Sequence, residues 1–114
     1  VPGEDAPLDS PGGPILLGSL DKGLIDGVIK AGMGEVRACY TALQRRVPDA
    51  AGTTTMKFVV AANGTVSSTA VKSSTIADVP FQDCLRKVFH GLRYPEPKGG
   101  GIVIVSYPLV FSPG

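Results

Sequence analysis

The sequence predicts an α+β domain in which helix, strand, strand, helix and strand follow one another, with both helices on one face of a small three-stranded sheet. Three observations support this fold class. Apolar residues recur at three- and four-residue spacing over 21–46 and again over 78–92, which is the period of helices with one buried face. Asn63-Gly64 joins two extended runs. A third strand-like segment follows three consecutive glycines near the end of the chain.

The length and composition are those of one domain with a tail. The chain has 114 residues, of which 43% are hydrophobic, and this suffices for a single modest core. Its first fourteen residues hold four prolines, three glycines and three of the ten acidic residues. We therefore expect a flexible Pro/Gly-rich linker over 1–18 and a folded domain over 19–114. The absence of an initial methionine suggests a domain cut from a longer protein.

The first helical region contains its own break. Ser19 or Asp21 is a candidate N-cap, and Pro48 lies just beyond the end of the pattern. Gly32 and Gly34 interrupt the region, and each glycine costs about 1 kcal/mol relative to alanine inside a helix. A bent helix or two consecutive helices are expected. The apolar face comprises Leu24, Ile25, Val28, Ile29, Met33, Val36, Cys39, Tyr40 and Leu43.

A β-hairpin follows. The run 53–62 alternates apolar and polar residues, and the return run 65–74 is rich in Ser and Thr and carries Lys72. Asn63-Gly64 between them is typical of a type I′ turn, which needs positive φ at both central residues. The Ser/Thr-rich composition of the return strand suits an exposed sheet edge.

The second helix starts at a cap, Asp78, and cannot continue through Pro95. A strand, helix, strand unit normally crosses over right-handed and sets its two strands parallel. We therefore expect the final strand beside the first hairpin strand. The resulting sheet order is 2-1-3: return strand, first hairpin strand, final strand.

The final strand is predicted to be the other edge of the sheet because Pro108 cannot donate to a strand ladder. If Pro108 faces outward, alternation turns the backbone groups of Ile102, Ile104 and Ser106 outward too, unpaired and open to an incoming chain. The helices should cover the opposite set of side chains, which is Val103, Val105, Tyr107, Leu109 and Phe111.

The two cysteines, Cys39 and Cys84, fall on the apolar faces of the two helices. Their spacing fits neither a zinc site nor a thioredoxin-type centre. A disulfide closing this loop of about 45 residues would contribute roughly 4 kcal/mol in the chain-entropy account and would imply an oxidising compartment. Two free buried thiols in a cytosolic core are the alternative.

The sequence gives little indication of nucleic-acid binding, of catalysis or of phosphate binding. With 11 basic and 10 acidic residues and no Lys/Arg stripe, a nucleic-acid binder is not expected. The single histidine, His90, has no Ser, Cys or Asp constellation near it, so no catalytic residues are assigned. Lys98 precedes its glycines and a strand follows, the reverse of a phosphate loop. We expect no enzyme, no metal and no cofactor.

Two stretches resemble known domains. "GTTTMKFVVAANGTVSSTAVKSS" followed, after a helix, by "LRYPEPKGGGIVIVSYPLVF" is similar to the C-terminal domain of the TonB energy-transducer family. The pair "VRACYTAL" and "FQDCLRKVF" resembles the two-cysteine, TonB-like domains of myxobacterial AgmX/PglI-type gliding-motility proteins, a pair that ordinary TonB domains lack.

The resemblance implies a periplasmic domain of an inner-membrane-anchored transducer, coupled upstream to a proton-driven motor complex. It implies an outer-membrane or periplasmic envelope partner held by strand addition. The segment expected to bind that partner is Ile102, Val103, Ile104, Val105, Ser106 and Tyr107. Gliding motility is favoured over TonB-dependent nutrient uptake. A homodimer through the same edge and a thiol switch at Cys39 and Cys84 are the competing interpretations.

Overall fold

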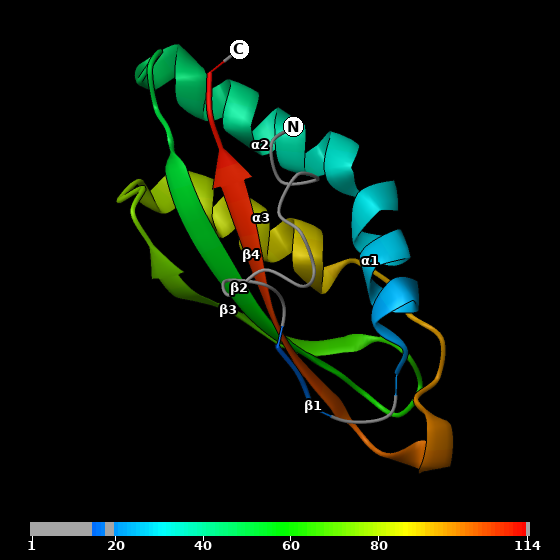
Figure 1. Cartoon of the computed structure of the whole chain (residues 1–114). Helices are drawn as coiled ribbons and strands as arrows, with labels where there is room; N and C mark the ends of the chain where they lie inside the picture. Colours follow the sequence, from blue (N-terminus) through cyan, green and yellow to red (C-terminus); the bar gives the residue numbers. More distant parts are fainter. Residues whose placement is uncertain (1–14, 18–19, 114) are drawn as a thin grey trace.

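The computed structural model describes residues 15–17 and 20–113, and in this part of the chain three helices pack on one face of a four-stranded sheet (Figure 1). The helices are α1 (Lys22–Ala31), α2 (Met33–Arg46) and α3 (Val79–His90). The strands are β1 (Ile15–Leu17), β2 (Gly52–Val60), β3 (Val66–Ser74) and β4 (Val103–Phe111), and a 3₁₀ turn, Lys98–Gly100, precedes β4.

The sheet order is β1-β4-β2-β3, with every neighbouring pair antiparallel. The expected order of return strand, first hairpin strand and final strand is confirmed as β3-β2-β4. Because β3 and β4 both run antiparallel to β2, they are parallel to each other, as a strand-helix-strand crossover requires. The fourth strand, β1, comes from the segment expected to be linker. It pairs with β4 on the side away from β2.

The first helical region is two consecutive helices, as Gly32 and Gly34 led us to expect. Asp21 is the N-cap of α1, with its side chain accepting from the Gly23 N–H at 2.7 Å. The break falls at Gly32. A β carbon there would lie 2.9 Å from Cδ2 of Leu92, so the glycine also lets the segment after α3 approach the junction.

The β2–β3 hairpin is present, but the predicted type I′ turn is wrong. Only Gly64 has positive φ, +85°, and Asn63 does not. The Gly64 N–H donates to the Ala61 carbonyl at 2.9 Å, and the Ala61 N–H donates to Thr65 at 2.7 Å. This is the arrangement of a three-residue loop ending in a left-handed glycine. Tyr94 explains the choice of glycine, since a β carbon at Gly64 would lie 2.1 Å from the Tyr94 carbonyl oxygen.

The core lies between the helices and the sheet. Phe111 at the end of β4 contacts Tyr40 of α2 and Phe81 of α3, with ring centroids 5.1 and 5.2 Å apart. At the other end, Phe58 of β2 packs on Phe89 of α3 at 5.5 Å. The inward side chains of β4 are each 2% exposed or less, as predicted: Val103, Val105, Tyr107, Leu109 and Phe111.

A disulfide between Cys39 and Cys84 joins α2 to α3, which confirms the predicted pair. Their Cα atoms are 5.8 Å apart, an ordinary separation for a bridge. Helix α3 lies against β3, and α2 lies under the end of β4 through the Tyr40–Phe111 contact. The disulfide therefore links the helix that packs on β3 to the helix that packs on the end of β4.

The outer edge of strand β4

The outer edge of β4 is formed by the residues whose backbone groups face away from β2: Ile104, Ser106, Pro108 and Val110. In an antiparallel pair, opposite residues alternate between those that exchange hydrogen bonds and those that do not. Pro108 is opposite Thr55 and has no N–H, which places it in a pair that does not exchange bonds. Alternation then assigns the same orientation to the other three. The register is consistent with the orientation predicted from the sequence, and both rest on the missing N–H of Pro108.

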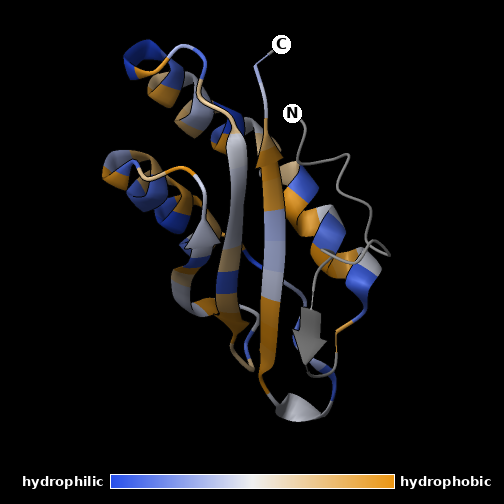
Figure 2. Cartoon of the chain, turned by 60° about the vertical axis from the view of Figure 1, so that its left-hand side comes forward, coloured by the Kyte–Doolittle hydropathy of each residue, from blue (hydrophilic) through white to orange (hydrophobic). Residues whose placement is uncertain are grey.

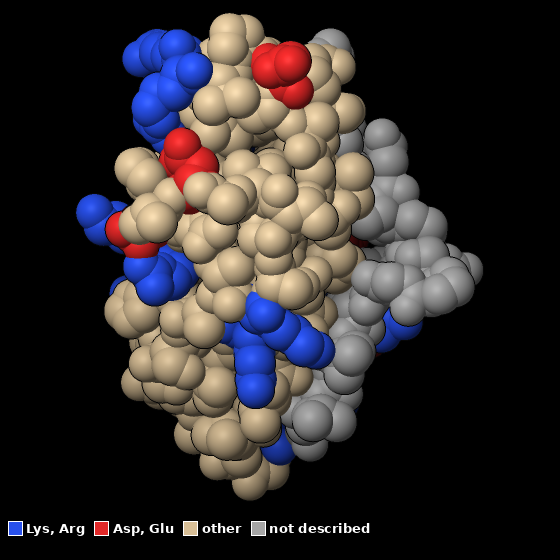
Figure 3. Space-filling view, turned by 90° about the vertical axis from the view of Figure 1, so that its left-hand side faces the viewer, with Lys and Arg blue, Asp and Glu red and all other residues tan. Residues whose placement is uncertain are grey.

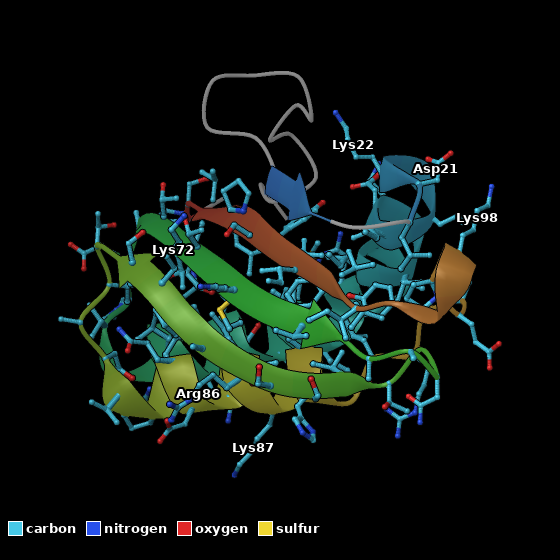
Figure 4. All side chains as sticks on the ribbon, turned by 90° about the horizontal axis from the view of Figure 1, so that it is seen from below. Asp21, Lys22, Lys72, Arg86, Lys87 and Lys98 are labelled. Carbon is cyan, nitrogen blue, oxygen red and sulfur yellow. A yellow bond between two sulfur atoms is a disulfide. The ribbon has the colours of Figure 1, made fainter. Side chains whose placement is uncertain are left out.

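This edge is not open along its whole length, which corrects the expectation of unpaired groups at Ile104 and Ser106. The pairing sets Ile15 opposite Ser106 and Leu17 opposite Ile104. The N–H and C=O groups of Ser106 and Ile104 point away from β2. β1 therefore pairs with the backbone groups that we expected to be free for a partner. Figure 4 shows β1 lying beside β4 at this side of the sheet.

Within the described residues, β1 pairs with only three of the nine residues of β4. Ile102, just before the strand, is 56% exposed, and Val110 near its end is 37% exposed. Ser106 and Pro108 are buried, and Ile104 is half-buried. The edge thus has a covered centre with an accessible apolar residue on either side.

The six residues predicted to bind a partner divide by face. Val103, Val105 and Tyr107 belong to the core, so they can stabilise the strand but cannot contact a partner with their side chains. The other three, Ile102, Ile104 and Ser106, alternate with them and lie on the opposite face. Recognition at this segment would depend on backbone groups and on the side chains of that opposite face.

Tyr107 fixes β4 to the first helix. Its hydroxyl donates to Oδ1 of Asp26 in α1 at 2.6 Å, and Lys30 lies 3.0 Å from Oδ2 of the same carboxylate. Burial, followed by this hydrogen bond to the carboxylate, raises the pKa of Tyr107 well above its ordinary value. The phenol therefore stays protonated and keeps its role as donor across the physiological pH range.

The segment leading into β4 also has a defined shape. Tyr94 stacks on Phe58 with centroids 5.7 Å apart, and its N–H donates to the Gly64 carbonyl at 2.9 Å. The glycines after Lys98 make a turn, with Gly99 and Gly100 at φ +77° and +72°. A β carbon built at Gly99 or at Gly100 would have no neighbouring atom within 4 Å. The turn that leads into β4 is therefore not packed closely against the rest of the domain at these two glycines.

Hydropathy distinguishes β4 from β3, the strand at the opposite edge of the sheet. In Figure 2, β4 is hydrophobic toward both ends, whereas β3 is pale. Thr69 of β3 lines an open groove of about 540 Å³ together with Asp83, Arg86, Lys87 and His90 of α3. Arg86 pairs with Asp83 in this groove. Figure 4 shows Lys72 on β3 and Arg86 and Lys87 on the neighbouring α3.

Basic side chains on this side form separate groups instead of one stripe (Figure 3). Among the residues that the structure describes, no cluster of three or more His, Cys, Asp or Glu could hold a metal ion. In the same part of the chain no helix combines the length and apolarity needed to cross a membrane.

Sequence reasoning missed β1. Its available signal was the apolar triplet Ile15, Leu16 and Leu17 between Gly12-Gly13-Pro14 and Gly18. Three residues show no period, and leucine is not a strong strand former. The pairing could have been suggested only by asking which apolar segment of the chain fits the edge that Pro108 defines.

Comparison with known proteins gives one structural likeness. The chain is similar to the solution structure of the TonB C-terminal domain of Helicobacter pylori, with 17% sequence identity, a TM-score of 0.46, and coverage of 82% of this chain and 91% of that one. No family model matches the chain, and no curated protein matches it.

Proposed function

We propose that the chain is an interaction domain that binds an extended segment of a cell-envelope protein by adding it to β4 as a strand. The observation that carries the proposal is that β4 already accepts a strand at its outer edge, from β1. Exposed Ile102 and Val110 lie to either side of that pairing and give an incoming strand more edge than β1 occupies.

Strand addition divides affinity and selectivity between two sets of groups. Backbone hydrogen bonds with Ile104, Ser106 and Val110 would supply affinity whatever the partner sequence. Selectivity would come from the face opposite the helices, where Ile102, Ile104 and Val110 are apolar. A partner segment with apolar residues at alternate positions would place them beside these three. A proline at a position that must donate to β4 would prevent pairing.

The proposed setting is the periplasm, at the end of a transducer that is anchored in the inner membrane and coupled to a proton-driven motor. The disulfide between Cys39 and Cys84 supports an oxidising compartment. The sequence resemblance to TonB-like and two-cysteine gliding-motility domains supports an outer-membrane or periplasmic partner and favours motility over nutrient uptake. Parallel backbone bonds loaded in shear would share the tension that such a role requires.

The test is a backbone-amide NMR titration with synthetic periplasmic segments of outer-membrane proteins. Each segment is compared with a version carrying proline at one central position. We expect shifts concentrated at Ile102–Tyr107 and Val110 with the first set and none with the second. Shifts confined to the helices, with Ile104 and Ser106 unchanged, would exclude strand addition at β4.

Sedimentation across a wide concentration range separates this proposal from self-association through the same edge. A monovalent adaptor stays monomeric up to high concentration. A tight dimer whose formation alters the amide signals of Ile104 and Ser106 would instead make the edge a homodimer interface and would end the adaptor proposal.

A further inference from the structure

We propose that β1 is a built-in competitor for the binding edge, so that a partner strand binds β4 by displacing the N-terminal segment of the same chain. The inference rests on the proposed function, because it describes how that same edge is kept and released. It adds a regulatory step, in which the domain has a closed state, with β1 paired, and an open state, with β1 released.

Mutual exclusion follows from the register. Ile15 is opposite Ser106 and Leu17 is opposite Ile104, and these two β4 residues direct their backbone groups away from β2. A backbone N–H donates one such bond, and a strand can have only one neighbour on a given side. A partner strand therefore cannot pair with Ile104 and Ser106 while β1 is in place.

The competitor is short, which makes displacement feasible. In the described part of the chain, β1 pairs with three residues, whereas β4 has nine. Val110 lies near the end of β4, beyond the three described pairs, and is 37% exposed. A partner can pair there first and then replace β1 at Ser106 and Ile104.

The competitor also stays close when it is released. Only residues 18–21 separate β1 from α1, and Leu20 is buried while Asp21 caps the helix. A displaced β1 therefore remains tethered near β4 at high effective concentration and re-pairs when the partner leaves. The apparent dissociation constant of a partner is then its intrinsic value divided by the fraction of open molecules.

Proline substitutions in β1 test this directly. In the Leu17→Pro variant the strand loses an N–H that faces β4, because Leu17 is in a pair that exchanges hydrogen bonds. Leu16→Pro is the matched control. Leu16 is opposite Val105, whose backbone groups are used by β2, so the N–H of Leu16 points away from β4. The control removes a leucine and adds a proline in the same strand while leaving the pairing groups intact.

The probe is a synthetic peptide with the sequence of residues 10–20, added to the folded domain and followed by the amide signals of Ile104 and Ser106. We expect the peptide to bind the Leu17→Pro variant roughly tenfold more tightly than the native chain, since releasing even one or two strand hydrogen bonds changes the open fraction by about that factor. The Leu16→Pro variant should behave like the native chain.

A covalent lock gives the opposite perturbation and keeps the test valid if a proline variant fails to fold. The double substitution Ile15→Cys and Ser106→Cys joins β1 to β4 across a directly opposed pair. The oxidised lock should bind neither the peptide nor any envelope segment. Mild reduction should restore binding, with the native chain in the same reductant as control.

The outcomes separate the two proposals. Equal peptide affinity for the native chain and the Leu17→Pro variant, with shifts at Ile104 and Ser106, would overturn the competitor model but leave strand addition intact. Binding to the locked form at those residues would do the same. An absence of shifts at β4 in every open variant would contradict strand addition itself, and the competitor proposal with it.

Discussion

The two sides of the sheet, at β3 and at β4, are protected from unwanted strand pairing in different ways. A strand with an unpaired side is a template for unwanted pairing. On β3 the side chains themselves reduce the risk, since the strand is rich in Ser and Thr and carries an exposed Lys72, and within the described residues no strand pairs beyond it. On β4 the residues are apolar and the protection is a separate strand, β1.

The difference has a functional meaning. Protection by composition is permanent, because Lys72 and the hydroxyls of β3 cannot be moved aside. Protection by β1 is reversible, because three paired residues can separate while the rest of the fold stays intact. The apolar edge of β4, which has the higher intrinsic tendency to pair, is thus covered by a strand that can be displaced. This arrangement is expected of a regulated binding strand.

The largest change expected is the loss of the disulfide that supports both sides of the sheet. Replacing Cys39 and Cys84 together by alanine should reduce the free energy of unfolding by about 4 kcal/mol, because the unfolded chain regains the entropy of a loop of about 45 residues. Urea denaturation of the oxidised native chain and the double variant measures this. A difference under about 1 kcal/mol would show that α2 and α3 hold both edge strands in place without the bond.

A smaller effect, specific to β4, should follow removal of the Tyr107 hydroxyl. Tyr107→Phe breaks the 2.6 Å hydrogen bond to Asp26 and should reduce the free energy of unfolding by about 1.5 kcal/mol, as for a bond to a charged group. Tyr94→Phe is the matched control. The Tyr94 hydroxyl is buried without a hydrogen-bond partner in the described structure, so its removal should leave stability unchanged or slightly raised.

Thermal melts of the two phenylalanine variants under one set of conditions decide this point. If Tyr94→Phe proved as destabilising as Tyr107→Phe, the loss at Tyr107 would reflect the ring environment and not the contact between β4 and α1.

The β3 side should respond to pH through Asp78, which caps α3. The Arg46 side chain, and then the Phe81 N–H, hold the pKa of Asp78 below its usual value of 3.8. A depressed folded-state pKa contributes stability above the unfolded value, and this contribution is lost as the pH falls through the folded value. Asp78→Asn should therefore be less stable than the native chain at neutral pH, and the difference should shrink below pH 3.8.

Denaturation midpoints of both proteins from pH 7 down to pH 2 provide the measurement. A gap that stays constant over the whole range would mean that the carboxylate charge of Asp78 contributes nothing beyond what the asparagine side chain supplies as a cap.

The smallest effect on stability is expected at Lys72. Lys72→Val should change the free energy of unfolding by less than about 0.5 kcal/mol, because the side chain is exposed. It should nevertheless promote association through β3, since it removes a charge from an open edge. Light scattering across concentration would detect this, with Lys57→Val on the central strand β2 as control. Equal association of both variants would show that general surface hydrophobicity, and not the edge, is responsible.

The sequence was sufficient for the features that depend on local patterns. Apolar periodicity predicted the helices, Asp21 and Asp78 were recognisable as caps, and the positions of Cys39 and Cys84 on facing helices predicted the disulfide. Pro108 identified which backbone groups of β4 face outward, because a missing N–H constrains alternation along the entire strand.

Two features depended on tertiary context and were missed or wrong. Asn63-Gly64 is compatible with more than one tight turn, and the close approach of Tyr94 to Gly64 belongs to a segment thirty residues away. β1 has no local signature, since three residues beside prolines and glycines form a strand only where an edge is available. The nature of the candidate site therefore changed from an open edge to one that the chain itself partly occupies.

Amide hydrogen exchange on β4 tests the central claim most directly. In the native chain we predict that the N–H groups of Ile104 and Ser106 are protected, though less than those of Val105 and Tyr107, which face β2, and that Val110 exchanges faster than all four. In the Leu17→Pro variant, Ile104 and Ser106 should become as fast as Val110 and regain protection when the peptide of residues 10–20 is added. Native Ile104 and Ser106 exchanging as fast as Val110 would contradict the claim that β1 holds this edge.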